Sequence, residues 1–342
     1  MFFEKVLQNV KVLIKKCSFA DFMEKVDIKD RKILYHLDLN SRQSFSQIGT
    51  KVGLHKDAVA LRVKRLKEKG IIIRFNTLID TLKLGYSCMR FYFNYQYTSP
   101  EIKEKIINHF VNFKHTQTVA SPEGSIDLCV FLLAKNVTEI HSFWQKTLSK
   151  YRDYFANQII APFIGENIYT KSFLIGEKDD RINQIVRRGG EIVDYDDLDF
   201  QILQLLARNS RIPTIDIANK LNITTATASK RIKTLKDLGI ILRFHITTNW
   251  ELIGYKWFKV DLYLKDYNKI NQIIKYLEGN PHLAYIDKTF GYADLELELI
   301  VENVNQLNQI IEDISSKFPK MIRSNTYFSV AKSHKWVDMP ER

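Results

Sequence analysis

The segment NSRQSFSQIGTKVGLHKDAVALRVKRLKEKGIIIRF at positions 40–75 decides the fold, because a related segment stands at 209–244. Residues 27–86 align with 196–255 without a gap, at a shift of 169, with 21 identities in 60 positions. Further along, GSIDL at 124–128 matches GYADL at 291–295 at a shift of 167, which fits one shortened loop. Chance does not account for so long a match, so the 342-residue chain is a tandem duplication.

Each copy opens with an amphipathic helix. The apolar residues at helical spacing are Ile33, Leu34 and Leu37 in copy one and Ile202, Leu203, Leu205 and Leu206 in copy two. Asp30 and Asp199 fall in its first turn, where the helix dipole favours a carboxylate. We therefore predict the same first helix in both copies.

Two shorter patterns follow the first helix. A second helix is expected at 44–51 and 213–220, and a third at 55–69 and 224–238. Gly70 and Gly239 stop the third helix, and β-rich stretches come next at 71–78 and 240–247. Three helices, a tight turn between the last two, and a following strand ribbon predict a winged helix-turn-helix in each copy.

The second part of each copy alternates strand and helix patterns. Copy one is expected to hold strands at 86–96, 117–120, 126–133 and 160–174, with helices at 100–113 and 137–151. Copy two is expected to hold strands at 255–264, 284–289, 295–301 and 323–331, with helices at 268–278 and 304–317. The order β-α-β-β-α-β is the ferredoxin-like arrangement, so the fold class is α+β.

This reading divides the chain into six parts. We predict an N-terminal helical extension at 1–26, winged helix-turn-helix domains at 27–80 and 195–249, ferredoxin-like sensing domains at 81–175 and 250–342, and a linker at 176–194. The linker interpretation rests on the charged stretch that carries Gly189 and Gly190.

Positive charge gathers on the helix-turn-helix segments. Residues 1–190 hold 31 Lys and Arg against 19 acids, a balance of +12, whereas residues 191–342 hold 20 of each. Within 40–75 the count is 9 against 2, or +7, and within 209–244 it is 7 against 2, or +5. A basic segment in a fold of this kind predicts contact with phosphates, so double-stranded DNA is the expected partner.

The third helices are the expected reading elements. One face of each is apolar and must point inward, with Val59, Val63 and Leu66 in copy one and Ala228, Ile232 and Leu235 in copy two. The opposite face and the basic residues beside it are the candidate DNA contacts: Arg42, Lys56, Asp57, Ala60, Leu61, Lys64, Arg65 and Arg74, then Arg211, Thr224, Thr225, Ser229, Lys230, Lys233 and Arg243. A solvated Lys-rich face is the alternative interpretation.

The two reading faces differ in chemistry. Copy one presents bulky and charged side chains, and copy two presents Thr225 and Ser229 with Thr224 as the expected N-cap. Phosphate positioning can then be similar in both copies while base preference is not. We expect two unequal half-sites in the DNA.

The pattern DRKIL…NSR…IG…VGL…RVKRLKEKGII…LGY of copy one resembles the leucine-responsive/asparagine-operon regulator family, Lrp/AsnC. The resemblance implies a DNA-binding transcription regulator whose ferredoxin-like domain senses a small metabolite, an amino acid above all. It also implies effector contacts near a Gly-x-x-Asp segment, at Gly124 and Asp127 and at Gly291 and Asp294. Turn capping by the two aspartates is the alternative. Family members usually carry one copy and dimerise through the sensing domain, so self-association through these domains and a pseudo-dimer within one chain are expected here.

Other chemistry is not indicated. The three Cys residues and eight His residues form no close ligand pair, and no phosphate loop, dinucleotide turn or nucleophile elbow is present, so no metal, cofactor or catalytic residue is expected. No apolar run is long enough to cross a bilayer and no signal peptide is recognisable, so we expect a cytoplasmic chain that avoids membranes. Two alternatives stay open, namely a siroheme-decarboxylase-like enzyme of the same two-part fold and a DNA-organising protein with little sequence choice.

Overall fold

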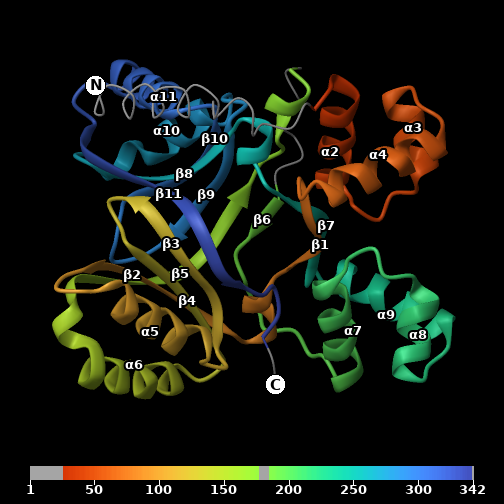
Figure 1. Ribbon diagram of the computed structural model, residues 1–342, viewed down its shortest axis with the longest axis horizontal. Coiled ribbons are helices and arrows are strands. Elements are labelled where there is room, and N and C mark those ends of the chain that lie inside the picture. The colour runs from red at the N-terminus through yellow and green to blue at the C-terminus, as the bar shows by residue number, and fades with distance from the viewer. Residues whose placement is uncertain (1–25, 177–184, 341–342) are drawn as a thin grey trace, which may run out of the picture.

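The computed structural model describes residues 26–176 and 185–340 (Figure 1). The predicted N-terminal extension at 1–26 therefore lies outside the described residues except for Val26.

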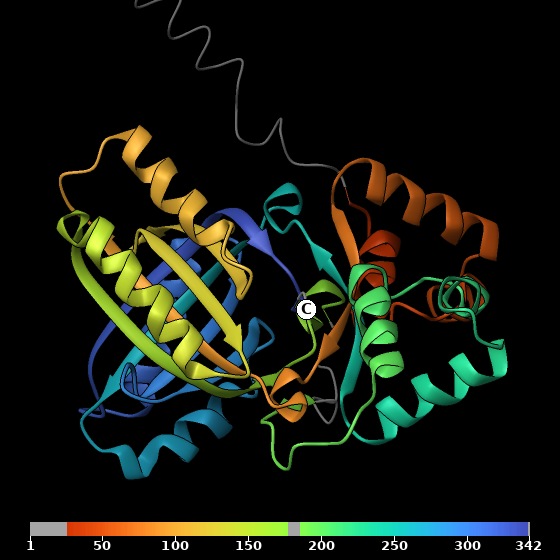
Figure 2. The same cartoon turned by 90° about the horizontal axis from the view of Figure 1, so that it is seen from below.

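The two helix-turn-helix units lie side by side at one end of the molecule, and the sheet units fill the other end (Figures 1 and 2). The first helix-turn-helix unit consists of α2 (Ile28–Leu39), α3 (Phe45–Val52), α4 (Lys56–Glu68) and β1 (Ile72–Ile79). The second consists of α7 (Asp197–Arg208), α8 (Thr214–Leu221), α9 (Thr225–Asp237) and β7 (Ile241–Thr248).

Local capping explains where these helices begin and end. Asp27 and Asp30 form a reciprocal capping box at the start of α2, and Asp196 and Asp199 do the same for α7. The backbone after α4 and after α9 turns through glycines with φ of +72° and +67°, a conformation that L side chains rarely adopt. The predicted first-turn carboxylates and helix stops are confirmed.

The strand ribbon is shared between the two copies. Each unit supplies a single strand, and β1 pairs antiparallel with β7 in a two-stranded sheet, with Phe75 opposite Ile246 and Thr77 opposite Phe244. The sequence predicts a ribbon after each third helix, but each ribbon is completed by the strand of the other copy. The two helix-turn-helix units are therefore joined through their backbones.

The sheet units repeat the predicted β-α-β-β-α-β order, which confirms the α+β class. The first consists of β2 (Ser87–Tyr95), α5 (Pro100–Val111), β3 (Thr116–Gly124), β4 (Leu128–Ala134), α6 (Val137–Tyr151) and β5 (Phe155–Ile168). The second consists of β8 (Lys256–Leu264), α10 (Ile270–Leu277), β9 (Leu283–Thr289), β10 (Leu295–Val301), α11 (Val304–Lys317) and β11 (Ile322–Trp336). One expected strand, 160–174, instead ends at 168, and 172–174 form a short 3₁₀ helix.

The last strand of each sheet unit crosses to the other unit. The first part of β5 pairs with β2 and its end pairs with β9, while β11 pairs with β8 and then with β3. The order β2-β4-β3-β11-β8-β10-β9-β5, closed by the β2–β5 pairing, leaves the two sheets joined at both edges. Part of the predicted linker, β6 (Ile185–Arg187), adds to the end of β5.

The two faces of the closed sheet differ. Alternate residues such as Phe91 and Phe93 on β2, and Val260 and Leu262 on β8, belong to the apolar cores that include residues of α5 and α6 or of α10 and α11. The helices lie outside the sheets on opposite sides (Figures 1 and 2). The intervening residues point to the interior between the sheets, where Arg90 and Lys259 occupy equivalent positions and are buried.

Candidate nucleic-acid interface

The helices α4 and α9 bury the face that the spacing predicts. Their buried residues are Val59, Val63 and Leu66 in α4 and Ala228, Ile232 and Leu235 in α9. Because a helix that buries one row presents the opposite row outward, this packing orients the candidate DNA contacts.

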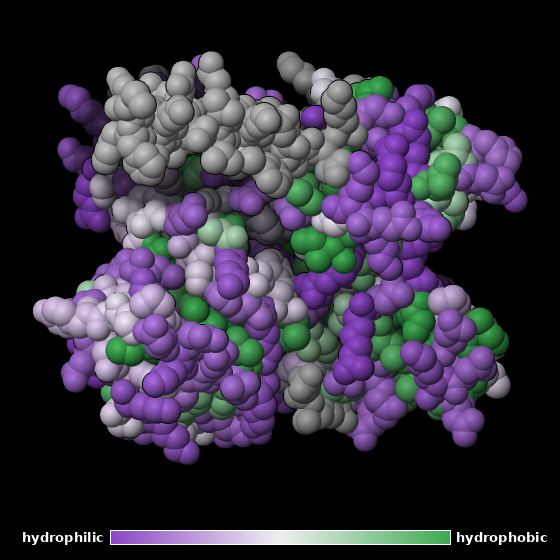
Figure 3. All heavy atoms as spheres, viewed as in Figure 1, coloured by the Kyte–Doolittle hydropathy of each residue, from purple (hydrophilic) through white to green (hydrophobic). Residues whose placement is uncertain are grey.

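The outward rows are open to solvent. On α4 the side chain of Lys64 is 72% exposed and Leu61 is 69% exposed. Their neighbours Lys56 and Asp57 are exposed as well, and Ala60 is half-buried. On α9 the exposed candidates are Thr224, Thr225, Ser229, Lys230 and Lys233. Mainly hydrophilic side chains cover α4 in the view of Figure 3.

The two reading helices begin differently. The hydroxyl of Thr224 accepts the backbone N–H of Thr227 at 3.0 Å, which confirms the predicted N-cap. At the equivalent place in α4, His55 makes no side-chain cap and its Nδ1 lies 3.2 Å from Asp57 Oδ2 in an exposed pair. An acidic group therefore stands at the start of α4, where α9 has Ala226.

An arginine in each reading helix anchors that helix to the first helix of its own unit. Arg62 reaches Asp27 and Asp30, and the equivalent Arg231 reaches Asp196 and Asp199. Sequence reasoning missed this role, although the same carboxylate pair and the same arginine recur at the shift of 169. The predicted DNA contact Arg65 also pairs with Asp30, and its side chain is 43% exposed.

The predicted contacts Arg42 and Arg211 lie between the two helix-turn-helix units. Arg42 donates to the carbonyls of Ser210 and Ile212 at 2.7 and 3.0 Å, and Arg211 donates to the carbonyls of Ser41 and Gln43. Between them the hydroxyls of Ser41 and Ser210 are 2.6 Å apart. The repeated Asn-Ser-Arg motif thus forms a reciprocal clasp, which we call the NSR clasp.

The predicted contacts Arg74 and Arg243 also face protein. Arg74 donates to the carbonyl of Trp336 at 3.0 Å and lies 3.5 Å from Asp338. Arg243 is buried 3.7 Å from Asp38. Both tie the β1–β7 ribbon to neighbouring elements and are not brought together with the reading faces.

The predicted effector segments hold turns together. Asp127 accepts the backbone N–H of Tyr95 at 2.8 Å, and Asp294 accepts that of Leu264 at 2.6 Å. Gly124 has a φ of +129°, and a Cβ there would lie 2.7 Å from the carbonyl oxygen of Tyr327, so the crossing of β11 requires glycine at this place. These contacts match the turn-capping alternative.

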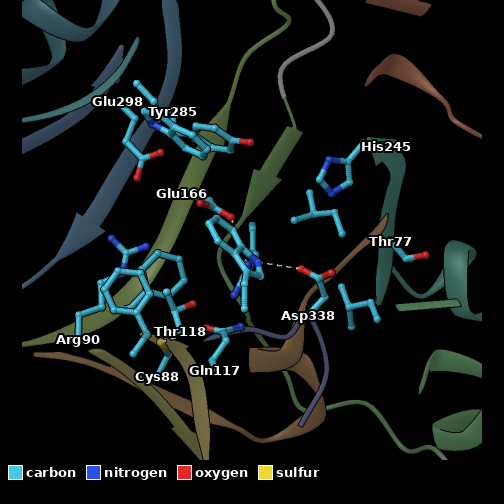
Figure 4. Close-up of a pocket in the computed structure, with 17 residues that line it drawn as sticks. Thr77, Cys88, Arg90, Gln117, Thr118, Glu166, His245, Tyr285, Glu298 and Asp338 are labelled. Carbon is cyan, nitrogen blue, oxygen red and sulfur yellow. Dashed lines mark hydrogen bonds and ion pairs between the residues drawn. The ribbon is translucent and has the colours of Figure 1, made fainter. Parts of the chain in front are cut away.

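A cavity lined by apolar, aromatic and charged side chains lies between the β1–β7 ribbon and the sheets (Figure 4). It has a volume of about 120 Å³, and we call it the junction cavity. Thr77 of β1 and His245 of β7 contribute to one side, and Arg90, Glu166 and Glu298 of the sheets contribute to the other. Burial, reinforced by Arg243 and Lys171, lowers the pKa of His245 to about 3, so its imidazole is neutral.

The described residues offer neither a metal-binding cluster nor a membrane-spanning helix. Residues 26–176 and 185–340 contain no cluster of three or more His, Cys, Asp or Glu that could hold a metal ion. In the same ranges no helix has both the length and the apolar character needed to span a membrane.

Comparison with known proteins points to one family. The AsnC-type helix-turn-helix domain model matches residues 26–67, and a winged helix-turn-helix DNA-binding model matches residues 195–241. An HTH-type transcriptional regulator of Pyrococcus furiosus is 33% identical over 103 residues, which cover 30% of this chain and 70% of that protein. The HTH-type transcriptional regulator Ptr1 of Methanocaldococcus jannaschii is 30% identical over 118 residues, covering 34% and 78%.

A solved structure shows the same fold over almost the whole chain. The siroheme decarboxylase NirDL matches with a TM-score of 0.61 and 14% identity, covering 92% of this chain and 94% of that one. The reading-helix geometry, the two domain matches and the relatives agree. The chain is a member of the Lrp/AsnC-type helix-turn-helix regulator family that carries two helix-turn-helix domains.

Proposed function

We propose that the chain regulates transcription by binding a specific double-stranded DNA sequence with α4 and α9 together, under the control of a small metabolite such as an amino acid. It acts as a pseudo-dimer within one chain. The observation that carries this proposal is the pairing of two exposed basic helices through the NSR clasp and the β1–β7 ribbon.

The pairing matters because two half-sites are read at a fixed separation. In helix-turn-helix dimers the spacing of the reading helices sets the spacing of the half-sites. Arg42 and Arg211 each make two bonds to carbonyls across the junction, and Arg211 also lies over the ring of Phe45 at 4.5 Å. A pair held this way needs no second chain to present both helices to one duplex.

The side chains on offer suit a major groove. Lys233 is exposed, and Lys64 lies 3.8 Å from Glu68 in an exposed pair that it can exchange for a phosphate or a guanine edge. The hydroxyl of Ser229 can donate to or accept from a base. Leu61 is a large apolar side chain held in solvent, and apolar contact with a thymine methyl would bury it. The two helices therefore favour different bases.

Selection of bound sequences from a random duplex library tests the proposal. We expect a winning site with two unequal halves and a steep loss of affinity as salt rises. A perfect palindrome would contradict unequal reading, and equal affinity for selected and scrambled duplexes would favour a DNA-organising protein. No binding in dilute buffer would refute the proposal.

We propose that the chain works by binding and not by catalysis. The fold of the siroheme decarboxylase NirDL supports the enzyme alternative, and one solved form of that protein is a co-complex with an iron-uroporphyrin III analogue. The junction cavity of about 120 Å³ is small against the roughly 300–1,000 Å³ of pockets for drug-sized ligands, and a tetrapyrrole is larger still. A titration with siroheme should leave its absorption spectrum unshifted, and a shift with release of carbon dioxide would restore the enzyme reading.

A further inference from the structure

The junction cavity joins the two functional ends of the molecule. Its volume of about 120 Å³ approaches the roughly 150 Å³ of an engineered cavity that binds benzene, so it admits a molecule of about five or six heavy atoms. The ribbon that unites the reading units supplies Thr77 and His245, and the sheets supply most of the remaining lining (Figure 4).

Most charged groups of the lining already have a partner. The guanidinium of Arg90 binds both oxygens of Asp287 and lies over the ring of Phe163 at 4.3 Å. That of Arg187 binds Glu166 at 3.2 Å. Each guanidinium is therefore paired with a carboxylate, although the buried Nε of each makes no hydrogen bond.

Asp338, which follows β11 and lines the same cavity, already has partners for its carboxylate. Its oxygens accept from Asn76 at 2.7 Å and from the indole of Trp336 at 3.1 Å, and Arg74 lies 3.5 Å away. Within the described residues this carboxylate has no unmet need for a cation.

Glu298 differs from these groups. Among residues 26–176 and 185–340 its carboxyl group makes no hydrogen bond and no ion pair, although it lines the cavity. Burial raises its pKa well above the ordinary range; Asp287 and Glu166 raise it as well, and Lys259 and Arg90 lower it. Lys259, Arg90 and Lys171 act on this carboxyl from a distance, and among the described residues none of them forms an ion pair with it.

Aromatic rings lie beside this carboxyl group. Trp257, Tyr285 and Trp336 all line the cavity, with Trp257 stacked on Tyr285 at 5.7 Å between centroids and 6.3 Å from Trp336. An aromatic π-system attracts a cation, most strongly when water is excluded. Two of these rings already attract a cation of the chain, since Lys171 Nζ lies 4.4 Å from the centroid of Tyr285 and the guanidinium of Arg74 lies 5.9 Å from that of Trp336. A carboxylate combined with aromatic rings is the chemistry that recognises an ammonium group.

The carboxylate and the aromatic rings that favour a cation come from the second repeat and not from the first. The positions equivalent to Trp257, Tyr285 and Glu298 also line the cavity, and they hold Cys88, Thr118 and Phe131. None of these three side chains carries a carboxylate that could pair with a cation. The cavity straddles the junction of the repeats but carries one set of ammonium-binding groups.

We propose that the junction cavity binds a small organic ammonium ion, with Glu298 as its counter-ion and the rings of Trp257, Tyr285 and Trp336 around it. The assignment of such a ligand as a regulator rests on the proposed DNA-binding function. Because β1 and β7 form part of the wall, a ligand that prefers one placement of the ribbon alters DNA affinity, and DNA alters ligand affinity by the same factor.

Calorimetric titration of the full chain with n-butylammonium tests the binding itself. We expect saturable binding, at least about tenfold tighter than that of n-butanol or butyrate, because only the ammonium supplies the missing charge. Titration with L-alanine, which has six heavy atoms, shows whether a carboxylate beside the ammonium is tolerated, and binding of either ammonium compound through Glu298 supports the proposal. Because the pKa of Glu298 is raised, repeating the titration in buffers of different ionisation enthalpy should show proton release that grows as pH falls, since a larger share of Glu298 then ionises when the ligand binds.

Two variants and a control separate binding from folding. Glu298→Gln removes the counter-ion and should weaken n-butylammonium binding by about tenfold or more, with n-butanol unaffected. Trp336→Leu should weaken the same ligand less and keep the cavity apolar. Glu302→Gln changes an exposed glutamate near the end of the same strand and should bind as the parent chain does. Thermal unfolding of each variant shows whether it is folded.

Equal binding of n-butanol and n-butylammonium, or full affinity in the folded Glu298→Gln variant, would overturn the proposal. DNA affinity of the ligand-free chain is measured separately. If the chain fails to bind DNA, the titration with n-butylammonium still tests the ammonium site independently. Coupling between the two is tested by measuring DNA affinity with and without saturating n-butylammonium.

Discussion

The helix-turn-helix units and the inner sheet faces come from the same duplication, and they have diverged to different degrees. In the helix-turn-helix units equivalent residues keep equivalent contacts. Arg62 and Arg231 bind the carboxylates of matching capping boxes, and Arg42 and Arg211 exchange carbonyl contacts across the junction. The outcome is a nearly two-fold pair of basic helices, as a duplex with its own two-fold backbone requires.

The inner sheet faces share only their cations. Arg90 and Lys259 are equivalent, but Cys129 and Phe131 of the first repeat correspond to Glu296 and Glu298 of the second. Carboxylates therefore gather on one side of the interior, and Lys259 binds Asp287 and Glu296 of its own repeat. In the proposed function both repeats do the same task, so their outer contacts are matched, whereas one ligand site needs only one copy of its groups.

The largest expected effect concerns the buried ion pairs of the unequal face. Asp287→Asn leaves Arg90 and Lys259 without their shared carboxylate and should lower the free energy of unfolding by about 3–5 kcal/mol. These cations hold the pKa of Asp287 well below its usual range. Its contribution is therefore present above the unfolded pKa near 3.9 and is lost as pH falls through the folded value.

Urea unfolding at pH 7 and in acid checks this prediction. The exposed Asp313→Asn serves as the matched control and should be neutral. A cost of Asp287→Asn that stayed below 1 kcal/mol at neutral pH would show that the inner cluster is not a source of stability.

The NSR clasp gives the next largest effect and tests the symmetry directly. Arg211→Ala and Arg42→Ala each remove two bonds from a charged donor to carbonyls, so each should cost roughly 1.5–3 kcal/mol and the two should agree within about 1 kcal/mol. Both should also weaken DNA binding by loosening the paired helices. Arg208→Ala, an exposed arginine at the end of α7, is the control. A large loss of stability in only one of the two variants would show that the two arginines are not equivalent.

Glu298 should show the opposite sign. Its folded pKa is raised, so ionisation opposes folding, and stability falls as pH rises from its unfolded value toward the folded one. Glu298→Gln should therefore be more stable than the parent chain at pH 7–8, by on the order of 1 kcal/mol, with no difference below pH 4. Thermal unfolding against pH measures this. A destabilised variant at pH 8 would mean that Glu298 has a partner in the folded chain.

The smallest effects belong to the reading lysines. Lys64→Ala and Lys233→Ala should each lower the salt dependence of DNA binding by about one ion and weaken binding by less than about tenfold. Lys317→Ala, exposed on α11, should change neither. Fluorescence anisotropy at several salt concentrations gives the slopes. If both variants lower the salt slope equally but change base preference unequally, α4 and α9 contact phosphates alike and read different bases.

Local sequence patterns predicted the helices and strands better than they predicted which distant residues contact one another. The spacing of Val59, Val63 and Leu66 identifies the inward face of α4, because a helix period depends only on neighbours in the chain. The order of strands and helices along the chain and the cap at Thr224 were predictable for the same reason. In contrast, charge alone suggested DNA contact for Arg42 and Arg211, and nothing in their spacing indicates the carbonyls that they bind about 170 residues away.

What the amino-acid sequence determined by itself is the duplication, the helices with their buried faces, and the basic character of both reading units. These follow from composition and from periodicities of a few residues. Only the tertiary structure decided that β1 pairs with β7, that β5 and β11 cross between units, and that Glu298 and three aromatic rings line one cavity beside the ribbon. Such contacts join segments far apart in the chain, and they depend on which surfaces pack together and not on any local repeat.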